Sequence, residues 1–100
     1  MEMINKVDLQ GTIGSIREYT DEKTISFSLM TAEMYKDGDA VIVDQMWHNI
    51  QTTKDKIKCE LEKGKAVHVL GKLMTKRYIG TDGVERQIVG VKATLVEDPI

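Results

Sequence analysis

Residues 7–14 read VDLQGTIG, and this stretch decides the kind of fold that the chain adopts. From Val7 to Ile13 every second residue is apolar or glycine, and this period of two predicts a strand with one buried face. Gly11 and Gly14 lie inside the stretch, which indicates a bulge or a close backbone approach. The chain is therefore expected to begin with a strand that bends.

The same alternation recurs along the rest of the chain, in segments separated by polar turns. Gly90 interrupts the last segment and indicates a further bulge. The remaining strands are predicted at residues 24–29, 40–50, 66–77 and 86–96, with turns at 18–23, 36–39 and 81–83. The apolar faces of the last two strands are expected to carry Val67, Val69, Gly71 and Leu73, and Ile88, Val91, Ala93 and Leu95.

Residues 54–63 follow a different pattern. Ile57 and Leu61 are four apart among charged residues, which predicts one apolar stripe on a short helix. Thr52 or Thr53 is suited to the N-cap of this helix, and Gly64 to its end.

The order of elements is three strands, a short helix and two more strands. Five short strands with bending glycines favour a closed barrel, because closure leaves no unpaired strand edge. We therefore predict a mainly all-β, five-stranded OB-fold barrel with one short helix between strands three and four. The only proline is Pro99 and no linker is apparent, so residues 1–100 are expected to form a single domain.

Composition restricts the class of protein. The chain has 100 residues, of which 41% are hydrophobic and 30% charged, which argues against a disordered chain. No apolar run is long enough to cross a membrane, and no secretory signal is apparent. The single cysteine, Cys59, fits a reducing compartment, so a cytoplasmic location is expected.

Motifs for catalysis are missing from the sequence. It has no G-x-S-x-G, no phosphate-binding G-x-x-x-x-G-K-[ST] and no H-E-x-x-H. His48, His68 and Cys59 have no close spacing and would make at most a partial metal site. We expect no enzyme activity, no cofactor and no metal.

Charge is unevenly distributed. The formal net charge is −2, but residues 63–92 contain seven cations and two carboxylates. The basic part suits a polyanion such as a nucleic acid, whereas the alternative is an ordinary solvated strand pair.

Aromatic residues narrow these alternatives. Tyr35 and Tyr78 each end a strand beside basic residues, and Trp47 lies within the third strand. Aromatic rings next to cations bind single-stranded nucleic acid, because bases stack on the rings while cations hold the phosphates. Trp47 could equally be a core or subunit-contact residue. Phe27 is expected in the core, and the remaining aromatic is Tyr19.

Several short motifs occur in an order and at a spacing that resemble the bacterial single-stranded DNA-binding protein family. The similarity extends over the OB domain of that family, which is nearly the whole chain. The motifs are Asn5-Lys6-Val7 through Gly11 and Gly14, Phe27-Ser28-Leu29, Trp47-His48, Lys63-Gly64, and Gly71-Lys72-Leu73 through Lys76-Arg77-Tyr78.

The resemblance implies binding of single-stranded DNA without sequence preference, in replication, recombination or repair. It assigns base stacking to Tyr35, Trp47 and Tyr78, and it places His48 near subunit contacts. The basic pair Lys76-Arg77 matches the family, which is usually a homotetramer. We expect the phosphate-binding residues to be Lys72, Lys76, Arg77, Arg86 and Lys6.

The sequence also departs from the family. Thr53 stands where an aromatic residue is expected, and the acidic tail that recruits replication and repair enzymes is not among these residues. Recruitment is therefore expected to be poor. Two alternatives remain: a dimer like primosomal replication protein N, and an OB domain that binds proteins instead of DNA. For a single-stranded DNA-binding protein, the expected location is the bacterial cytoplasm, in association with the nucleoid.

Overall fold

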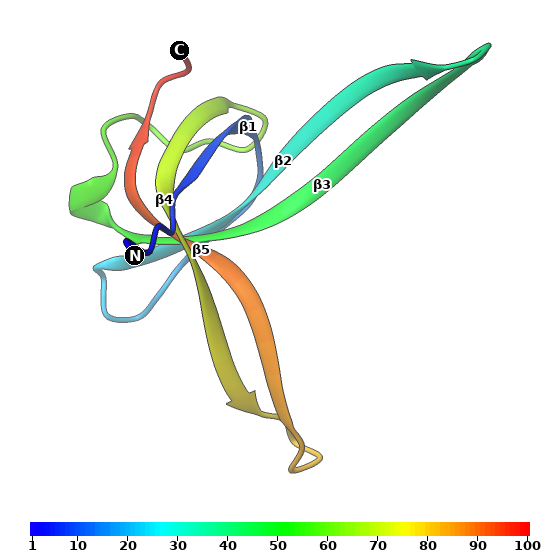
Figure 1. Cartoon of the computed structure of the whole chain (residues 1–100). Coiled ribbons are helices and arrows are strands. Elements are labelled where there is room, and N and C mark those ends of the chain that lie inside the picture. Colours follow the sequence, from blue (N-terminus) through cyan, green and yellow to red (C-terminus); the bar gives the residue numbers. More distant parts are fainter.

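The computed structural model describes residues 1–100 as five strands that close into a barrel (Figure 1). Neighbouring strands are antiparallel except β3 and β5, which pair in parallel at Ile50 and Val91. The predicted barrel is therefore confirmed. In chain order the elements are β1 (Val7–Glu18), β2 (Thr24–Asp37), β3 (Ala40–Thr53), the 3₁₀ turn η1 (Lys54–Lys56), β4 (Ala66–Ile79) and β5 (Glu85–Glu97). The barrel order is β1-β2-β3-β5-β4.

The core fills the barrel from alternate strand positions, as period-two patterns require. Ile13, Leu29, Val67, Val69 and Val96 are at most 1% exposed. Leu73 and Ile88, which the pattern assigned to apolar faces, are instead 53% and 44% exposed. Leu73 lies where β4 leaves the barrel, and Ile88 pairs with Lys76 on the face of the ribbon opposite to the core residue Val91.

Two of the glycine predictions differ in outcome. The β1–β2 register shifts between Ile13 and Ile16, so the bulge expected near Gly14 is confirmed. Gly90, by contrast, pairs regularly with Met74, and the β4–β5 bulge lies between Leu70 and Gly71. A Cβ on Gly90 would lie 3.2 Å from the Asn49 carbonyl oxygen, so close packing of β5 on β3 explains this glycine.

The helix predicted over residues 54–63 is wrong in its extent, because only η1 forms there. Ile57 makes a bridge to Val96, and the Lys58 N–H donates to the Val96 carbonyl at 2.7 Å. Ile57 and Leu61 still pack against the core, as their spacing indicated. The segment gains these contacts along β5 directly, whereas a helix this short is costly to nucleate.

Two hairpins project far beyond the barrel (Figure 1). The β2–β3 arm, residues 31–46, turns at Gly38, and the β4–β5 arm, residues 72–92, turns at Gly83. At the root of the β4–β5 arm, Val91 and Lys92 still pair with β3 in the barrel. Both glycines have positive φ, 64° and 77°, which favours glycine at these positions. The predicted turns are confirmed, and the strands continue further than the alternation alone indicated.

Candidate nucleic-acid interface

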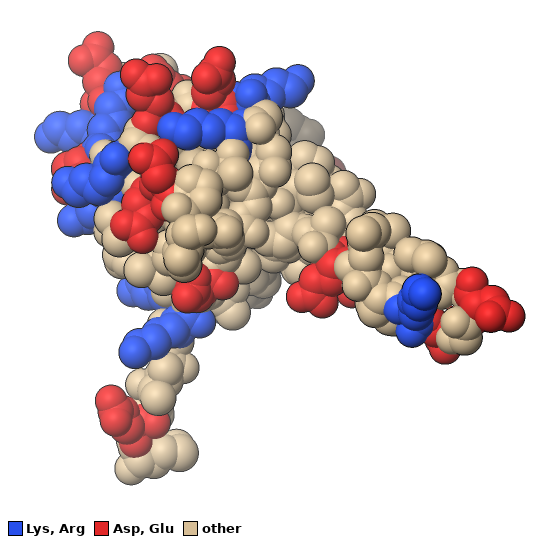
Figure 2. Space-filling model, turned by 90° about the horizontal axis from the view of Figure 1, so that it is seen from above, with Lys and Arg blue, Asp and Glu red and all other residues tan.

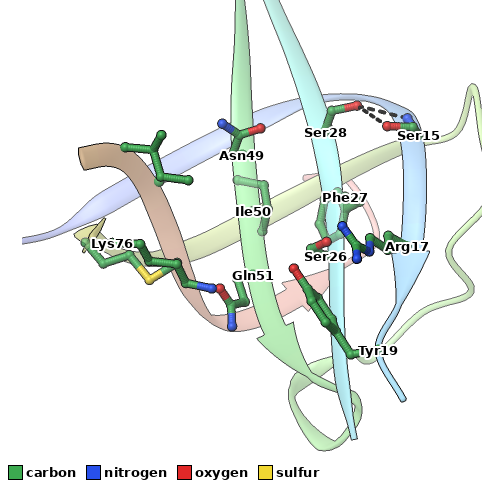
Figure 3. A pocket seen from close by; sticks show the side chains of 13 residues that line it. Ser15, Arg17, Tyr19, Ser26, Phe27, Ser28, Asn49, Ile50, Gln51 and Lys76 are labelled. Carbon is green, nitrogen blue, oxygen red and sulfur yellow. Dashed lines mark hydrogen bonds between the residues drawn. The ribbon is translucent and has the colours of Figure 1, made fainter. Parts of the chain in front are cut away.

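A groove of about 310 Å³ crosses the outer face of β2 and β3 (Figure 3). Ser26 pairs with Gln51 and Ser28 with Asn49, so these four polar side chains share one face. They alternate with Phe27 and other core residues along the same strands. The period of two therefore places a polar floor in the groove directly over the hydrophobic core.

Cations line both walls of the groove. Arg17 and Tyr19 lie on the β1 side and Lys76 on the β4–β5 side, with Ser26 and Gln51 between them (Figure 3). The Arg17 guanidinium lies 5.0 Å from the centre of the Tyr19 ring, within cation–π range. No carboxylate lines the groove, so its charge favours an anionic ligand.

The β1–β2 turn holds Tyr19 at the edge of the groove. The Asp21 carboxylate accepts hydrogen bonds from the N–H groups of Lys23 and Thr24 and from the Thr24 hydroxyl. These bonds, led by that of the Thr24 backbone, lower the pKa of Asp21 below its ordinary value. The Tyr19 N–H in turn donates to the Thr24 carbonyl at 3.1 Å, which fixes the backbone from which its ring projects.

A second hollow, of about 410 Å³, continues the groove toward Trp47. It shares Ser15 and Ser28 with the groove and adds Gly14, Trp47 and Lys63. Trp47 is 56% exposed, so it is not a core residue. A Cβ on Gly14 would lie 2.5 Å from the Trp47 Cζ3 atom, so this glycine leaves room for the ring.

The β4–β5 arm presents most of its cations on one face. Lys72 pairs with Lys92 and Tyr78 with Arg86, in the same alternation as the groove residue Lys76. Arg77 pairs with Gln87 and projects from the opposite face. The basic pair Lys76-Arg77, adjacent in sequence, is therefore divided between two faces.

Of the cations on the β4–β5 arm, Arg86 is the least available for binding a phosphate. Its Nη2 lies 2.6 Å from Asp82 Oδ2, in an ion pair at the tip of the arm. Hydrogen bonds from the Val84 N–H and then from Arg86 lower the pKa of Asp82. A phosphate at Arg86 would have to compete with this carboxylate.

Three other predicted site residues lie away from the groove. Tyr35 is 53% exposed on the β2–β3 arm, on the opposite face of the ribbon from Trp47. Lys6 is exposed immediately before β1. His48 is partly buried at the root of the β2–β3 arm, where its Nε2 lies 2.8 Å from the Thr31 hydroxyl.

His68 is buried on the barrel rather than placed in the groove. Its two ring nitrogens contact Glu97 at 2.9 Å and Asp8 at 2.5 Å. These hydrogen bonds, that to Glu97 first, raise the pKa of His68 above its ordinary value. No cluster of three or more His, Cys, Asp or Glu side chains is arranged to hold a metal ion.

Sequence analysis missed four residues of the groove: Arg17, Tyr19, Asn49 and Gln51. The polar phase of β2 and β3 contained a signal for the last two, since that phase had to face outward. Arg17 and Tyr19 are far in sequence from Lys76, so only the closed barrel brings them to the same groove.

The structure has no helix long and apolar enough to cross a membrane.

Comparisons by sequence find relatives but no matching family model. Single-stranded DNA-binding proteins from Neisseria meningitidis serogroups A and B are each 31% identical to the chain over 98 residues. The match covers 90% of this chain and 56% of each relative, so the chain spans about half the length of the curated relatives.

Solved structures show the same fold. A Plasmodium falciparum single-stranded DNA-binding protein in complex with single-stranded DNA has a TM-score of 0.74 at 25% identity, covering 95% of this chain and 90% of that one. The small single-stranded DNA-binding protein of Streptomyces coelicolor has a TM-score of 0.68 at 16% identity, covering 98% and 97%. A variant of the Thermus aquaticus protein has a TM-score of 0.72 at 19% identity, covering 97% and 51%.

Proposed function

We propose, from the premise that this chain is an OB domain of the single-stranded DNA-binding protein family, that it binds single-stranded DNA without a chemical step. The observation that carries the proposal is the groove that joins Tyr19, Arg17 and Lys76 to the exposed Trp47 and contains no carboxylate. OB folds bind oligonucleotides on the face of strands two and three, between the loops that flank this groove.

The proposed roles follow from the surroundings of each side chain. Trp47 and Tyr19 stack on bases, and Arg17 and Lys76 hold the adjacent phosphates. The path continues along the β4–β5 arm past Tyr78, Lys72 and Lys92, which share the face of Lys76. Weaker contacts with DNA are assigned to four further residues. Tyr35, Lys6 and Arg77 do not share the face of the groove, and Arg86 is paired with Asp82.

The wider biological role is part of the same proposal. Residues 1–100 act as one OB domain that assembles into a homo-oligomer, a tetramer with a dimer as the alternative, and His48 lies near a subunit contact. The protein coats single strands in replication, recombination or repair, in the bacterial nucleoid. Support comes from the names of the relatives and from the partly buried position of His48 beside Thr31.

The single tryptophan provides the test. Trp47 fluorescence is followed during titration with oligo-dT at low and at moderate salt. We expect quenching, with an affinity that falls with salt at a slope of about 0.7 per phosphate neutralised. Failure to bind in a gel-shift assay at low salt would overturn the function. Binding without quenching would retain the function and remove Trp47 from the stacking residues.

A further inference from the structure

Each arm has one face that points away from the groove and has no partner. These faces continue the core positions of their strands, those of Leu29 and Ile50 in one arm and that of Val91 in the other. We call them the inner faces. On the β2–β3 arm the inner face comprises the odd-numbered residues of 31–37 and the even-numbered residues of 40–46, and on the β4–β5 arm the odd-numbered residues of 73–79 and 85–89.

The inner face of the β2–β3 arm is acidic. All three carboxylates on the strands of this arm, Glu33, Asp37 and Asp44, lie there, whereas the face that continues the groove past Trp47 carries only Lys36. Glu33 and Asp44 lie directly opposite each other, and neither forms an ion pair within the chain. A cation from outside the hairpin would relieve their repulsion.

The inner face of the β4–β5 arm offers such a cation. Arg77 is the only cation of this face, it forms no ion pair within the chain, and the one carboxylate of the face, Glu85, lies near the tip. Leu73, Ile79 and Val89 share the face and are 53%, 74% and 61% exposed. Apolar side chains gathered on one exposed face are typical of a surface that another protein covers.

The two inner faces match each other in layout. Tyr35 and Met46 lie on either side of the pair of carboxylates, and they are 53% and 60% exposed. Val89 and Ile79 lie on either side of Arg77 in the same way. The two arms of one copy point in different directions, so these faces cannot meet within one chain (Figure 1). Both halves of the match are present on every copy, which identifies a second copy as the partner.

We propose that the inner face of the β2–β3 arm binds the inner face of the β4–β5 arm of a second copy, with Arg77 between Glu33 and Asp44. The inference rests on the proposed assembly of this chain with copies of itself and names a surface for it. Two copies related by a two-fold axis make this contact twice, because each has one face of each kind. The groove faces of both arms point away from the contact and stay open to DNA.

The test measures self-association without DNA, by sedimentation velocity over a range of protein concentrations. One variant is R77E and the other is E33K/D44K, which reverses the acidic face but keeps like charges opposite each other within the hairpin. We expect each variant alone to associate about tenfold or more weakly, because like charges then meet across the contact. An equimolar mixture of the two should regain association, because both contacts of a mixed pair then join opposite charges.

The matched control is Lys76→Glu. It reverses the cation next to Arg77 in sequence, but on the groove face of the same arm, so association should be unchanged. A loss equal to that of R77E would overturn the assignment to the inner face. Thermal unfolding of each variant checks that weaker association does not come from loss of the fold.

The remaining outcomes separate this contact from the proposals beneath it. A wild-type protein that stays monomeric would overturn both the assembly and the arm contact. Association that persists in both variants would overturn the arm contact and retain an assembly through another surface. A mixture that stays dissociated would overturn the pairing of these two faces. Failure to bind oligo-dT, measured separately, would overturn the DNA-binding function alone.

Discussion

The two arms are built alike and charged oppositely. Each is a two-stranded hairpin that continues barrel strands and turns at a glycine with positive φ. The β2–β3 arm carries four carboxylates and one lysine, whereas the β4–β5 arm carries five cations and two carboxylates. In Figure 2 the β2–β3 arm projects to the right, with acidic side chains at its root and tip and one basic side chain.

This difference shows that the net charge of the chain is a poor guide to its partner. Glu33 and Asp44 lie directly opposite each other on the β2–β3 arm, an arrangement that costs stability. On the β4–β5 arm, Asp82 and Glu85 are confined to the tip, Lys76 lines the groove, and Lys92 pairs with the groove residue Gln51. A polyanion is therefore directed to the groove and the base of the β4–β5 arm, although the overall charge is negative.

The largest expected effect is on stability, and it tests the barrel core from which both arms extend. Leu29 is 0% exposed in the barrel at the root of the β2–β3 arm, and Leu29→Ala should lower the unfolding free energy by about 2–5 kcal/mol through the cavity that it leaves. Chemical denaturation measures this loss. Met34→Ala, at a site 75% exposed on the arm, is the control and should change stability by about 0.5 kcal/mol or less. Equal losses would mean that the arm is as important for stability as the barrel.

Reversing the charge of one lysine on each arm should show which arm contributes to DNA binding. Lys76→Glu places a carboxylate in the groove and should weaken oligo-dT binding by on the order of tenfold, with a shallower salt dependence. Lys36→Glu removes the one lysine of the β2–β3 arm and should have a much smaller effect. Fluorescence titration at several salt concentrations measures both. Equal effects of the two reversals would show that DNA follows both arms.

Between pH 5 and 9 a pH dependence of stability is expected from the barrel but not from the arms, because the pKa of Asp82 on the β4–β5 arm is lowered below its ordinary 3.8 and lies outside this range. The hydrogen bonds that the His68 ring donates to Glu97 and Asp8 raise the pKa of His68 above its ordinary 6.5, so the charged imidazole stabilises the fold. That stabilisation is complete below the ordinary value and is lost as the pH rises through the folded-state pKa. Unfolding free energies measured from pH 5 to 9 should show this fall in the wild type.

Two variants make the assignment to His68 specific. His68→Gln should flatten the pH dependence of the unfolding free energy in this window. Glu97→Gln should narrow the pH range over which stability falls, because only Asp8 then remains to hold the charged ring. An unaltered pH profile in His68→Gln would assign the dependence to another group.

The smallest effect concerns the like-charged pair on the β2–β3 arm. Glu33→Lys places a cation opposite Asp44 and should stabilise the hairpin by about 0.2–1 kcal/mol. Denaturation measures the gain, and a fluorescence titration shows whether a less acidic arm also binds DNA more tightly. A loss of stability would indicate that the carboxylate has a contact beyond its own hairpin.

Local alternation predicted the strands because each pattern depends only on near neighbours. The polar phase of Ser26 and Ser28 and the apolar phase of Phe27 and Leu29 are confirmed by burial. The helix over residues 54–63 was wrong because the bridge between Ile57 and Val96 joins segments far apart in sequence. Short helical patterns are easily overridden by such tertiary contacts.

The site was harder to predict for the same reason. Trp47 and Lys76 were identified from their residue type and neighbours, and both line the groove or its continuation. Arg17 and Tyr19 join them only through barrel closure, and adjacent Arg77 faces the other way because neighbouring strand residues alternate. The roles of these residues in binding remain proposals.

The length of the arms has a consequence for how the protein moves. All residues of β2 from Ala32 to Asp37 and of β4 from Thr75 to Ile79 are exposed, with one partner strand and no core beneath. A two-stranded hairpin of this kind is marginally stable alone, so its amide hydrogens should exchange long before those of the barrel. A strand of DNA lying along an arm would suppress this opening. Part of the free energy of DNA binding would then offset the cost of ordering the arm. Protection of individual amide hydrogens from exchange would map the path of the DNA residue by residue.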